Sequence, residues 1–182
     1  MVRDELLALL KVRSFREGDF VLASGRRSAY YVDVRRTSLT GRGAWLIGNA
    51  LVDAMLRQGV WPAVVGGLSM GADPLITATG MVAESRSLRL GQVYIRKEPK
   101  GHGTGQQLER GGDVPEAGEA VVLEDTTTTG GSSMKAVMAL RNAGYVVRHV
   151  FTIVDRGEGA SELLATDDLR LHALFGIGDL RS

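Results

Sequence analysis

Residues 121–133 constrain the fold of this chain more than any other stretch. They read Val-Val-Leu-Glu-Asp-Thr-Thr-Thr-Thr-Gly-Gly-Ser-Ser, so three apolar residues precede two acids and then a turn rich in hydroxyl groups and glycine. A helical pattern begins directly after this turn. A buried strand that leads through such a turn into a helix is the unit from which parallel α/β sheets are built.

The same alternation of strand and helix continues along the chain on both sides of this segment. Short apolar runs predict the strands, and apolar residues at helical spacing predict the helices between them. The expected strands are residues 63–66, 92–96, 120–123 and 146–154, and the expected helices are residues 43–58, 73–84 and 131–143. We therefore predict an α/β fold in which a parallel sheet is flanked by helices.

The two ends of the chain do not fit this alternation. Residues 2–13 have the pattern of a helix, and residues 15–36 are mixed, with two short strands around a turn at 24–28. We expect residues 1–35 and the tail from about residue 158 to residue 182 to form a small cap over one end of the sheet. At 182 residues and 44% hydrophobic content, the whole chain, 1–182, is expected to form a single domain.

Composition excludes several classes of function. The absence of Cys rules out disulfides, thiol catalysis and Cys-based zinc sites, and three His residues are too few for a His-rich metal site. A net charge of +1 and the lack of a helix-turn-helix pattern argue against a nucleic-acid partner. No apolar run approaches the roughly 20 residues of a membrane span, and the run at 6–10 is too short for a signal peptide. We expect a soluble, cytoplasmic protein without a membrane partner.

Glu124 and Asp125 are the first candidates for chemistry, because they stand at the carboxyl end of an expected parallel strand, where α/β sheets bind ligands. Adjacent acids can accept hydrogen bonds from vicinal hydroxyl groups or hold a divalent cation through water. The residues after them offer hydroxyl groups and backbone N–H groups that suit a phosphate: Thr126, Thr127, Thr128, Thr129, Gly130, Gly131 and Ser132. In the plainer interpretation, one acid caps the turn, the other is solvated, and Ser132 or Ser133 is a helix N-cap.

A basic segment precedes the most glycine-rich part of the chain. Arg96, Lys97, Lys100 and His102 lie at the start of residues 97–115, which hold five glycines and few apolar residues. A long loop of this kind inside a compact domain is usually functional or disordered. The cations suit the oxygens of a pyrophosphate, although a solvated basic surface is the alternative.

Three further segments have both a functional and a plain structural interpretation. The turn at residues 66–74 could bind an anion through backbone N–H groups, or it could simply join a strand to a helix. The segment 20–35 could be an ordinary hairpin with a basic turn. The pair Asp155-Arg156 could be a structural ion pair, or its guanidinium could bind a carboxylate in bidentate fashion.

Together these segments resemble, in order, those of the orotate phosphoribosyltransferases, a family of type I phosphoribosyltransferases. Residues 121–133 are similar to the signature for phosphoribosyl pyrophosphate (PRPP), and the Arg-Lys-x-x-Lys-x-His pattern from Arg96 resembles the family's flexible catalytic loop. The Ser-Gly-x-x-Ser-x-x-Tyr pattern that ends at Tyr31 is also similar, with Arg27 where a Lys is usual. In the resembling pyrophosphate loop, Ser69 and Met70 stand where some members carry Tyr-Lys.

This resemblance implies an enzyme of pyrimidine biosynthesis that transfers ribose 5-phosphate from PRPP to orotate, giving orotidine 5′-monophosphate and pyrophosphate. It implies Mg²⁺ as a cofactor held mainly by PRPP, with Glu124 and Asp125 reaching it through water, and a homodimer with shared active sites. The implied roles are catalysis for Lys100, His102, Arg96 and Lys97; PRPP binding for Arg27, Ser69, Met70, Glu124, Asp125 and residues 126–132; and orotate binding for Thr128, Arg156 and Tyr31. The alternatives are a phosphoribosyltransferase for a purine or related base, and a regulator that senses PRPP without catalysis.

Overall fold

The computed structural model describes residues 1–21, 25, 27–98 and 107–182. Its centre is a six-stranded sheet in the order β5-β4-β3-β6-β7-β8, which is parallel except for the edge strand β5. The strands are β3 (Val64–Leu68), β4 (Gly91–Ile95), β5 (Leu108–Arg110), β6 (Gly118–Thr127), β7 (Tyr145–Asp155) and β8 (Arg170–Gly176). The predicted α/β class with a mainly parallel sheet is confirmed.

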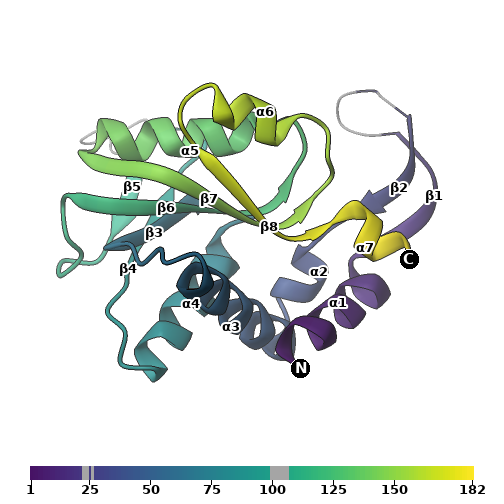
Figure 1. Ribbon diagram of the computed structural model, residues 1–182, viewed down its shortest axis with the longest axis horizontal. Helices are drawn as coiled ribbons and strands as arrows, with labels where there is room; N and C mark the ends of the chain where they lie inside the picture. The colour runs from purple at the N-terminus through teal and green to yellow at the C-terminus, as the bar shows by residue number, and fades with distance from the viewer. Residues whose placement is uncertain (22–24, 26, 99–106) are drawn as a thin grey trace.

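Helices cover both faces of this sheet, and each face has its own apolar core (Figure 1). The helices α3 (Gly41–Arg57) and α4 (Asp73–Ser85) contribute to one core, and α5 (Gly131–Asn142) and α6 (Ala160–Ala165) contribute to the other. Strand β6 supplies both cores, since Val121 lies in the first and Val122 in the second. This alternation follows from the period of two along a strand and explains why the centre of β6 reads as a continuous apolar run.

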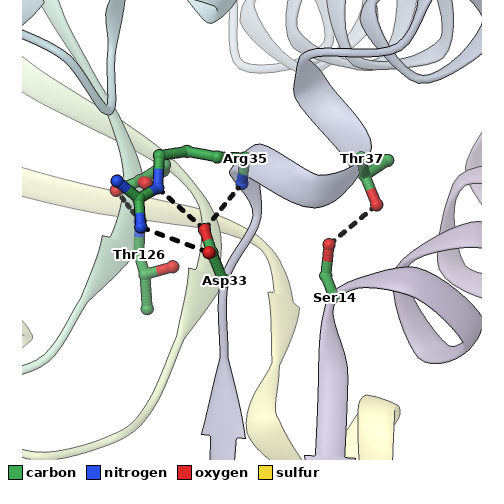
Figure 2. Close-up of polar contacts among 6 residues, drawn as sticks. Ser14, Asp33, Arg35, Thr37 and Thr126 are labelled. Atoms are coloured by element: carbon green, nitrogen blue, oxygen red, sulfur yellow. Dashed lines mark hydrogen bonds and ion pairs between the residues drawn. The ribbon is translucent and has the colours of Figure 1, made fainter.

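The N-terminal cap consists of α1 (Val2–Arg13) and an antiparallel pair formed by β1 (Phe15–Val21) and β2 (Arg27–Val32). The short helix α2 (Arg35–Ser38) leads from this pair into α3. Ser14 and Thr37 share a buried hydrogen bond of 2.7 Å between their hydroxyl groups, which fixes the start of β1 to α2 (Figure 2). The β1–β2 pair is therefore held beside the carboxyl end of β6 and can form one wall of a cleft there.

The tail prediction was wrong in part. Strand β8 pairs in parallel with β7 and extends the central sheet, so it does not belong to the cap. This strand lies at the edge of the sheet and is only partly buried: Arg170 at its start is exposed, and Phe175 near its end is buried. It was not among the strands predicted from the sequence. Only the last helix, α7 (Ile177–Arg181), packs near α1, where the Lys11 ammonium group donates a hydrogen bond of 2.9 Å to the carbonyl of Ser182 (Figure 1).

Two other boundaries also differ from the prediction. Strand β6 continues through Thr127 because its ladder with β7 runs as far as the pair Thr127–Asp155, so both acids lie inside the strand. Part of the expected loop 97–115 is strand β5, which pairs with β4 and closes a hairpin; residues 99–106 lie outside the described residues. Among the described helices, none has the length and apolar character needed to cross a membrane.

The α3–α4 contact depends on Gly48, and this gives a test of the fold. A Cβ atom at Gly48 would lie 2.5 Å from the carbonyl oxygen of Ala78 in α4, so the helices would have to separate. We expect Gly48→Ala to lower the free energy of unfolding by about 1–3 kcal/mol, measured by urea denaturation. Gly41→Ala, at the open start of the same helix, is the control and is expected to stay within about 0.5 kcal/mol of the parent. Equal effects of the two substitutions would contradict this account.

Candidate active site

A cleft of about 920 Å³ lies at the carboxyl ends of β3, β4 and β6. One wall comes from the end of β2 and the residues after it, including Tyr31 and Arg35. The floor comes from the β3–α4 turn and from the end of β6, and Arg96 and Lys97 stand where β4 ends. Because four separate segments converge here, the cleft has the position at which α/β sheets commonly bind ligands.

A smaller cavity of about 280 Å³ adjoins the cleft and is built almost entirely by the Thr/Gly/Ser run. Its lining residues are Glu124, residues 126–133 and Lys135. Gly130 has a φ of 85°, a left-handed conformation that favours glycine, and α5 begins at the next residue. The first N–H groups of α5 and the neighbouring hydroxyl groups therefore surround a space suited to an anion.

The acids of β6 point to opposite faces of the sheet, since they are consecutive in a strand, and both still line the cleft because the strand ends there. The Glu124 side chain accepts a hydrogen bond of 3.2 Å from Ser133 in α5. Asp125 faces the β3–α4 turn, where a Cβ atom at Gly71 would come within 2.9 Å of its carboxylate. Glycine at position 71 therefore lets the turn approach this acid closely.

Burial, and then the charge of neighbouring Asp125, raise the pKa of the Glu124 carboxyl group to about 8. Burial also raises the pKa of Asp125, although the backbone N–H of Thr126 and the charge of Arg35 act in the opposite direction. The pair therefore binds a proton more tightly than exposed acids do. Hydroxyl donors or a cation from a ligand would stabilise the charged form of this buried pair, so such a ligand binds favourably here.

The β3–α4 turn places Ser69 and Met70 in the cleft. The Ser69 hydroxyl donates to the Asp73 carboxylate at 2.9 Å, so it supports the turn itself. Met70 is 65% exposed, and the peptide bond between Ser69 and Met70 is cis. Since neither side chain carries a charge, binding of an anion here has to rely on backbone N–H groups and on cations from other segments.

The predicted catalytic cations are placed only in part. Arg96 and Lys97 line the cleft, and the Arg96 guanidinium is paired with Glu109 of β5 at 2.8 Å. Lys100 and His102 lie outside the described residues. Arg27 forms an exposed ion pair of 3.0 Å with Asp19 across the β1–β2 hairpin and is not among the residues that line either cavity.

The predicted orotate residues occupy three different positions. Tyr31 lines the cleft, while Thr128 lines the smaller cavity. Arg156 is not among the lining residues of either one, and its guanidinium is paired with Glu158 at 2.8 Å. The sequence therefore locates the ends of the right strands, but it does not say which way each side chain turns.

Several residues that line these cavities were not among the predicted site residues, and three of them carry charge beside the acid pair or the phosphate cradle. Asp33 and Arg35 form an ion pair of 2.8 Å at the cleft wall (Figure 2), and the charge of Arg35 also influences Asp125. Lys135 lines the smaller cavity and brings a cation to the phosphate cradle. Its spacing of four residues from Gly131, one helical turn, was a usable signal, because residues so spaced share a helix face.

Comparison with known proteins decides the family. No protein-family model matches the chain. The chain is 41% identical over 181 residues to the orotate phosphoribosyltransferase of Thermosynechococcus vestitus, covering 100% of this chain and 94% of that relative. The chain belongs to the orotate phosphoribosyltransferase family. The membership expected from the sequence is thereby confirmed.

Solved structures of this family have the same fold. The Mycobacterium tuberculosis orotate phosphoribosyltransferase in complex with Fe(III) dicitrate matches with a TM-score of 0.84 and 36% identity, covering 99% of each chain. The same enzyme in complex with PRPP matches with a TM-score of 0.81 and 33% identity, covering 100% of each chain. The predicted type I phosphoribosyltransferase fold, with its mainly parallel sheet flanked by helices, is therefore confirmed.

The raised pKa of Glu124 predicts a pH dependence of stability. Free glutamate titrates near 4.5 and the folded group near 8, so between these values the folded chain binds more protons than the unfolded chain. The free energy of unfolding therefore falls as pH rises through this window. Glu124→Gln lacks this contribution, so we expect its free energy of unfolding to decline less between about pH 5 and pH 8 in urea titrations. Glu84→Gln, at an exposed position of α4, serves as the control, and a wild-type slope in Glu124→Gln would contradict the assignment.

Proposed function

We propose that this chain transfers the ribose 5-phosphate group of PRPP to orotate, giving orotidine 5′-monophosphate and pyrophosphate in pyrimidine biosynthesis. One observation carries the proposal. Glu124, Thr126 and Ser132 line both the cleft and the smaller cavity, so an anion cradle, an acid pair and a basic mouth form one continuous site. PRPP has the matching order of groups, with a 5-phosphate, a ribose diol and a pyrophosphate.

The donor fits this site in a single direction. The 5-phosphate occupies the smaller cavity, where the N–H and hydroxyl groups of residues 126–132 meet it. The ribose 2′- and 3′-hydroxyl groups then lie over Glu124 and Asp125. The pyrophosphate extends toward the turn at Ser69 and Met70 and toward the cations at the mouth. Arg27 contacts PRPP only if the β1–β2 hairpin moves toward the cleft.

The acid pair also fits the expected Mg²⁺. Among the described residues, no three acidic or imidazole side chains come together as a metal site, so a protein-only cage is not present there. Mg²⁺ commonly binds through one or two carboxylates, several waters and substrate phosphates, which matches two acids beside a pyrophosphate position. When bound with PRPP, the ion neutralises charge on the pyrophosphate. Glu124 and Asp125 are the residues that would hold it, through water.

Catalysis requires that charge be stabilised as the bonds exchange. Orotate N1 forms a bond to ribose C1 and releases its proton to the departing pyrophosphate, while the bond from C1 to the pyrophosphate oxygen breaks with its electron pair on that oxygen. Positive charge therefore develops on the ribose and negative charge on the leaving group in the transition state. Arg96 and Lys97 at the cleft, with Lys100 and His102 of the loop, are the cations we assign to the leaving group. We also propose that closure of the segment that carries Lys100 and His102 excludes water that would hydrolyse PRPP.

The acceptor is assigned to the other side of the ribose. Tyr31 on the cleft wall contacts the orotate ring, Thr128 approaches from the phosphate cradle, and the Arg156 guanidinium pairs with the orotate carboxylate. The resemblance of the loop supports a homodimer in which it completes the partner subunit's site. The same family membership supports a cytoplasmic location.

A direct assay tests the function. The purified chain is incubated with PRPP and either orotate or one of a panel of purine bases, with and without Mg²⁺, and nucleotide and pyrophosphate are quantified. We expect orotidine 5′-monophosphate with orotate alone, and a rate that depends on Mg²⁺. Turnover of a purine base in place of orotate would support the purine alternative. PRPP binding without any turnover would support a regulator.

The diol assignment predicts the effect of Asp125→Asn. The substitution keeps the shape of the side chain but removes the charged acceptor, so we expect kcat/KM for PRPP to fall by about 10- to 100-fold. Asp53→Asn is the matched control, because Asp53 pairs with Arg86 away from the cleft. Wild-type affinity and turnover in Asp125→Asn would show that the diol binds elsewhere.

The loop assignment predicts the effect of Lys100→Ala. Loss of one donor that stabilises transition-state charge typically lowers kcat by about 10²–10³. Lys11→Ala removes the same charge at the end of α1, where Lys11 contacts only the C-terminus in the described structure, and we expect it to retain activity. An unchanged rate of orotidine 5′-monophosphate formation in Lys100→Ala would remove the loop from the mechanism.

A further inference from the structure

Both the backbone and the side chain of Arg156 are fixed by contacts with other residues. Its backbone N–H donates a hydrogen bond of 3.0 Å to the Thr127 carbonyl, and the Thr127 hydroxyl donates to the Asp155 carboxylate at 2.9 Å. These bonds fix the end of β7 to the end of β6, beside the phosphate cradle. The Arg156 side chain is only 9% exposed. A guanidinium so deeply placed requires a partner for its charge.

Two side chains meet this guanidinium from different parts of the chain. The Glu158 carboxylate forms an ion pair of 2.8 Å with the Arg156 Nη2 atom, and the Glu158 side chain is 20% exposed. Tyr30 of β2 places its ring 4.9 Å from the Arg156 guanidinium carbon and accepts from Nε at 3.4 Å. The first contact balances the charge, and the second limits the rotation of the guanidinium plane.

These contacts leave one edge of the guanidinium available. The group carries five N–H donors; its Nε–H donates to Tyr30, and its Nη2 atom lies 2.8 Å from the Glu158 carboxylate. Nη1 has no acceptor within the described part of the chain, so Nη1 and the second Nη2 hydrogen form an edge that a carboxylate can bind with both oxygens. Glu158 therefore aligns Arg156 without filling the edge that recognition needs.

Tyr30 connects this edge to the cap. Its ring also lies 6.0 Å from the Phe15 ring and 5.7 Å from the Arg181 guanidinium carbon of α7. Tyr30 and Tyr31 are consecutive in β2 and point to opposite faces, so one holds Arg156 while the other lines the cleft. The strand thus links the position of the Arg156 guanidinium to that of the cleft wall.

We propose that Glu158 and Tyr30 are positioning residues for the acceptor: they hold Arg156 so that its free edge selects a base that carries a carboxylate. This inference rests on the proposed function, because it assigns how that same site recognises orotate. A positioning role predicts different effects on the two substrates, whereas a general structural role predicts the same effect on both. Loss of alignment weakens binding of orotate and leaves the PRPP side of the site unchanged.

The test separates the two substrates in Glu158→Gln, which keeps the size of the side chain and removes its charge. We expect KM for orotate to rise by about tenfold or more, with KM for PRPP within about twofold of wild type. Glu158→Asp keeps the charge and is expected to recover part of the loss. Preference for orotate over uracil, which lacks the carboxylate, is expected to fall. Glu162→Gln, at an exposed position of α6 nearby, is the matched control and is expected to match wild type.

Tyr30→Phe provides a second variant that deletes only one hydroxyl group and therefore keeps the test valid if Glu158→Gln does not fold. We expect it to raise KM for orotate by a smaller factor, since the ring contact with Arg156 remains. Unchanged orotate KM in both variants overturns the positioning role, as does an equal rise in both KM values. A lower orotate KM in Glu158→Gln also overturns it, because Glu158 would then compete with the substrate. Wild-type chain that forms no orotidine 5′-monophosphate overturns the proposed function itself.

Discussion

The hydrogen-bonded ladder between β6 and β7 is the constraint on which the rest of the site depends. It continues to the pair Thr127–Asp155, so both strands end together at one edge of the sheet. The acid pair, the phosphate cradle and Arg156 all take their positions from this common end. Because the ladder is buried between two apolar cores, the ends of these strands are fixed before any ligand is present. The site is therefore largely preorganised on its donor side.

Burial of the acid pair has a cost in stability that is best understood through binding. Glu124 is 7% exposed and its pKa is raised, so the folded chain disfavours its charge at neutral pH. A core residue of similar size would avoid this penalty, yet strand β6 keeps two acids where its apolar run ends. A ribose diol or a hydrated cation supplies the donors or the charge that the folded chain alone does not. The unfavourable electrostatics then become a gain in affinity when such a ligand binds.

Local patterns predict most of the fold, and contiguous motifs predict most of the donor site. The cores of β3, α4 and α5 follow from periodicity, and the cradle follows from one run of residues at a strand end. Both edge strands were missed: β5 has only three residues, whereas the alternation of polar and apolar residues at the start of β8 was a usable strand signal. The contact of Arg156 with Tyr30 was not predictable in this way, because Tyr30 lies 126 positions away and no local pattern states which strands a fold brings together.

The donor half and the acceptor half of the site are therefore built in different ways. The proposed contacts to the 5-phosphate and the ribose diol come from consecutive residues of one β-turn-α unit, so they follow directly from a short sequence. Acceptor contacts combine the cap, the end of β7 and the residues after it, so they depend on how distant segments pack. Tyr30 lies at the centre of this packing, since Phe15, Arg156 and Arg181 all contact its ring. A change in the cap can therefore alter recognition of the acceptor through Tyr30. Binding of the donor phosphate would be unaffected, because the β6–β7 ladder holds the cradle in place.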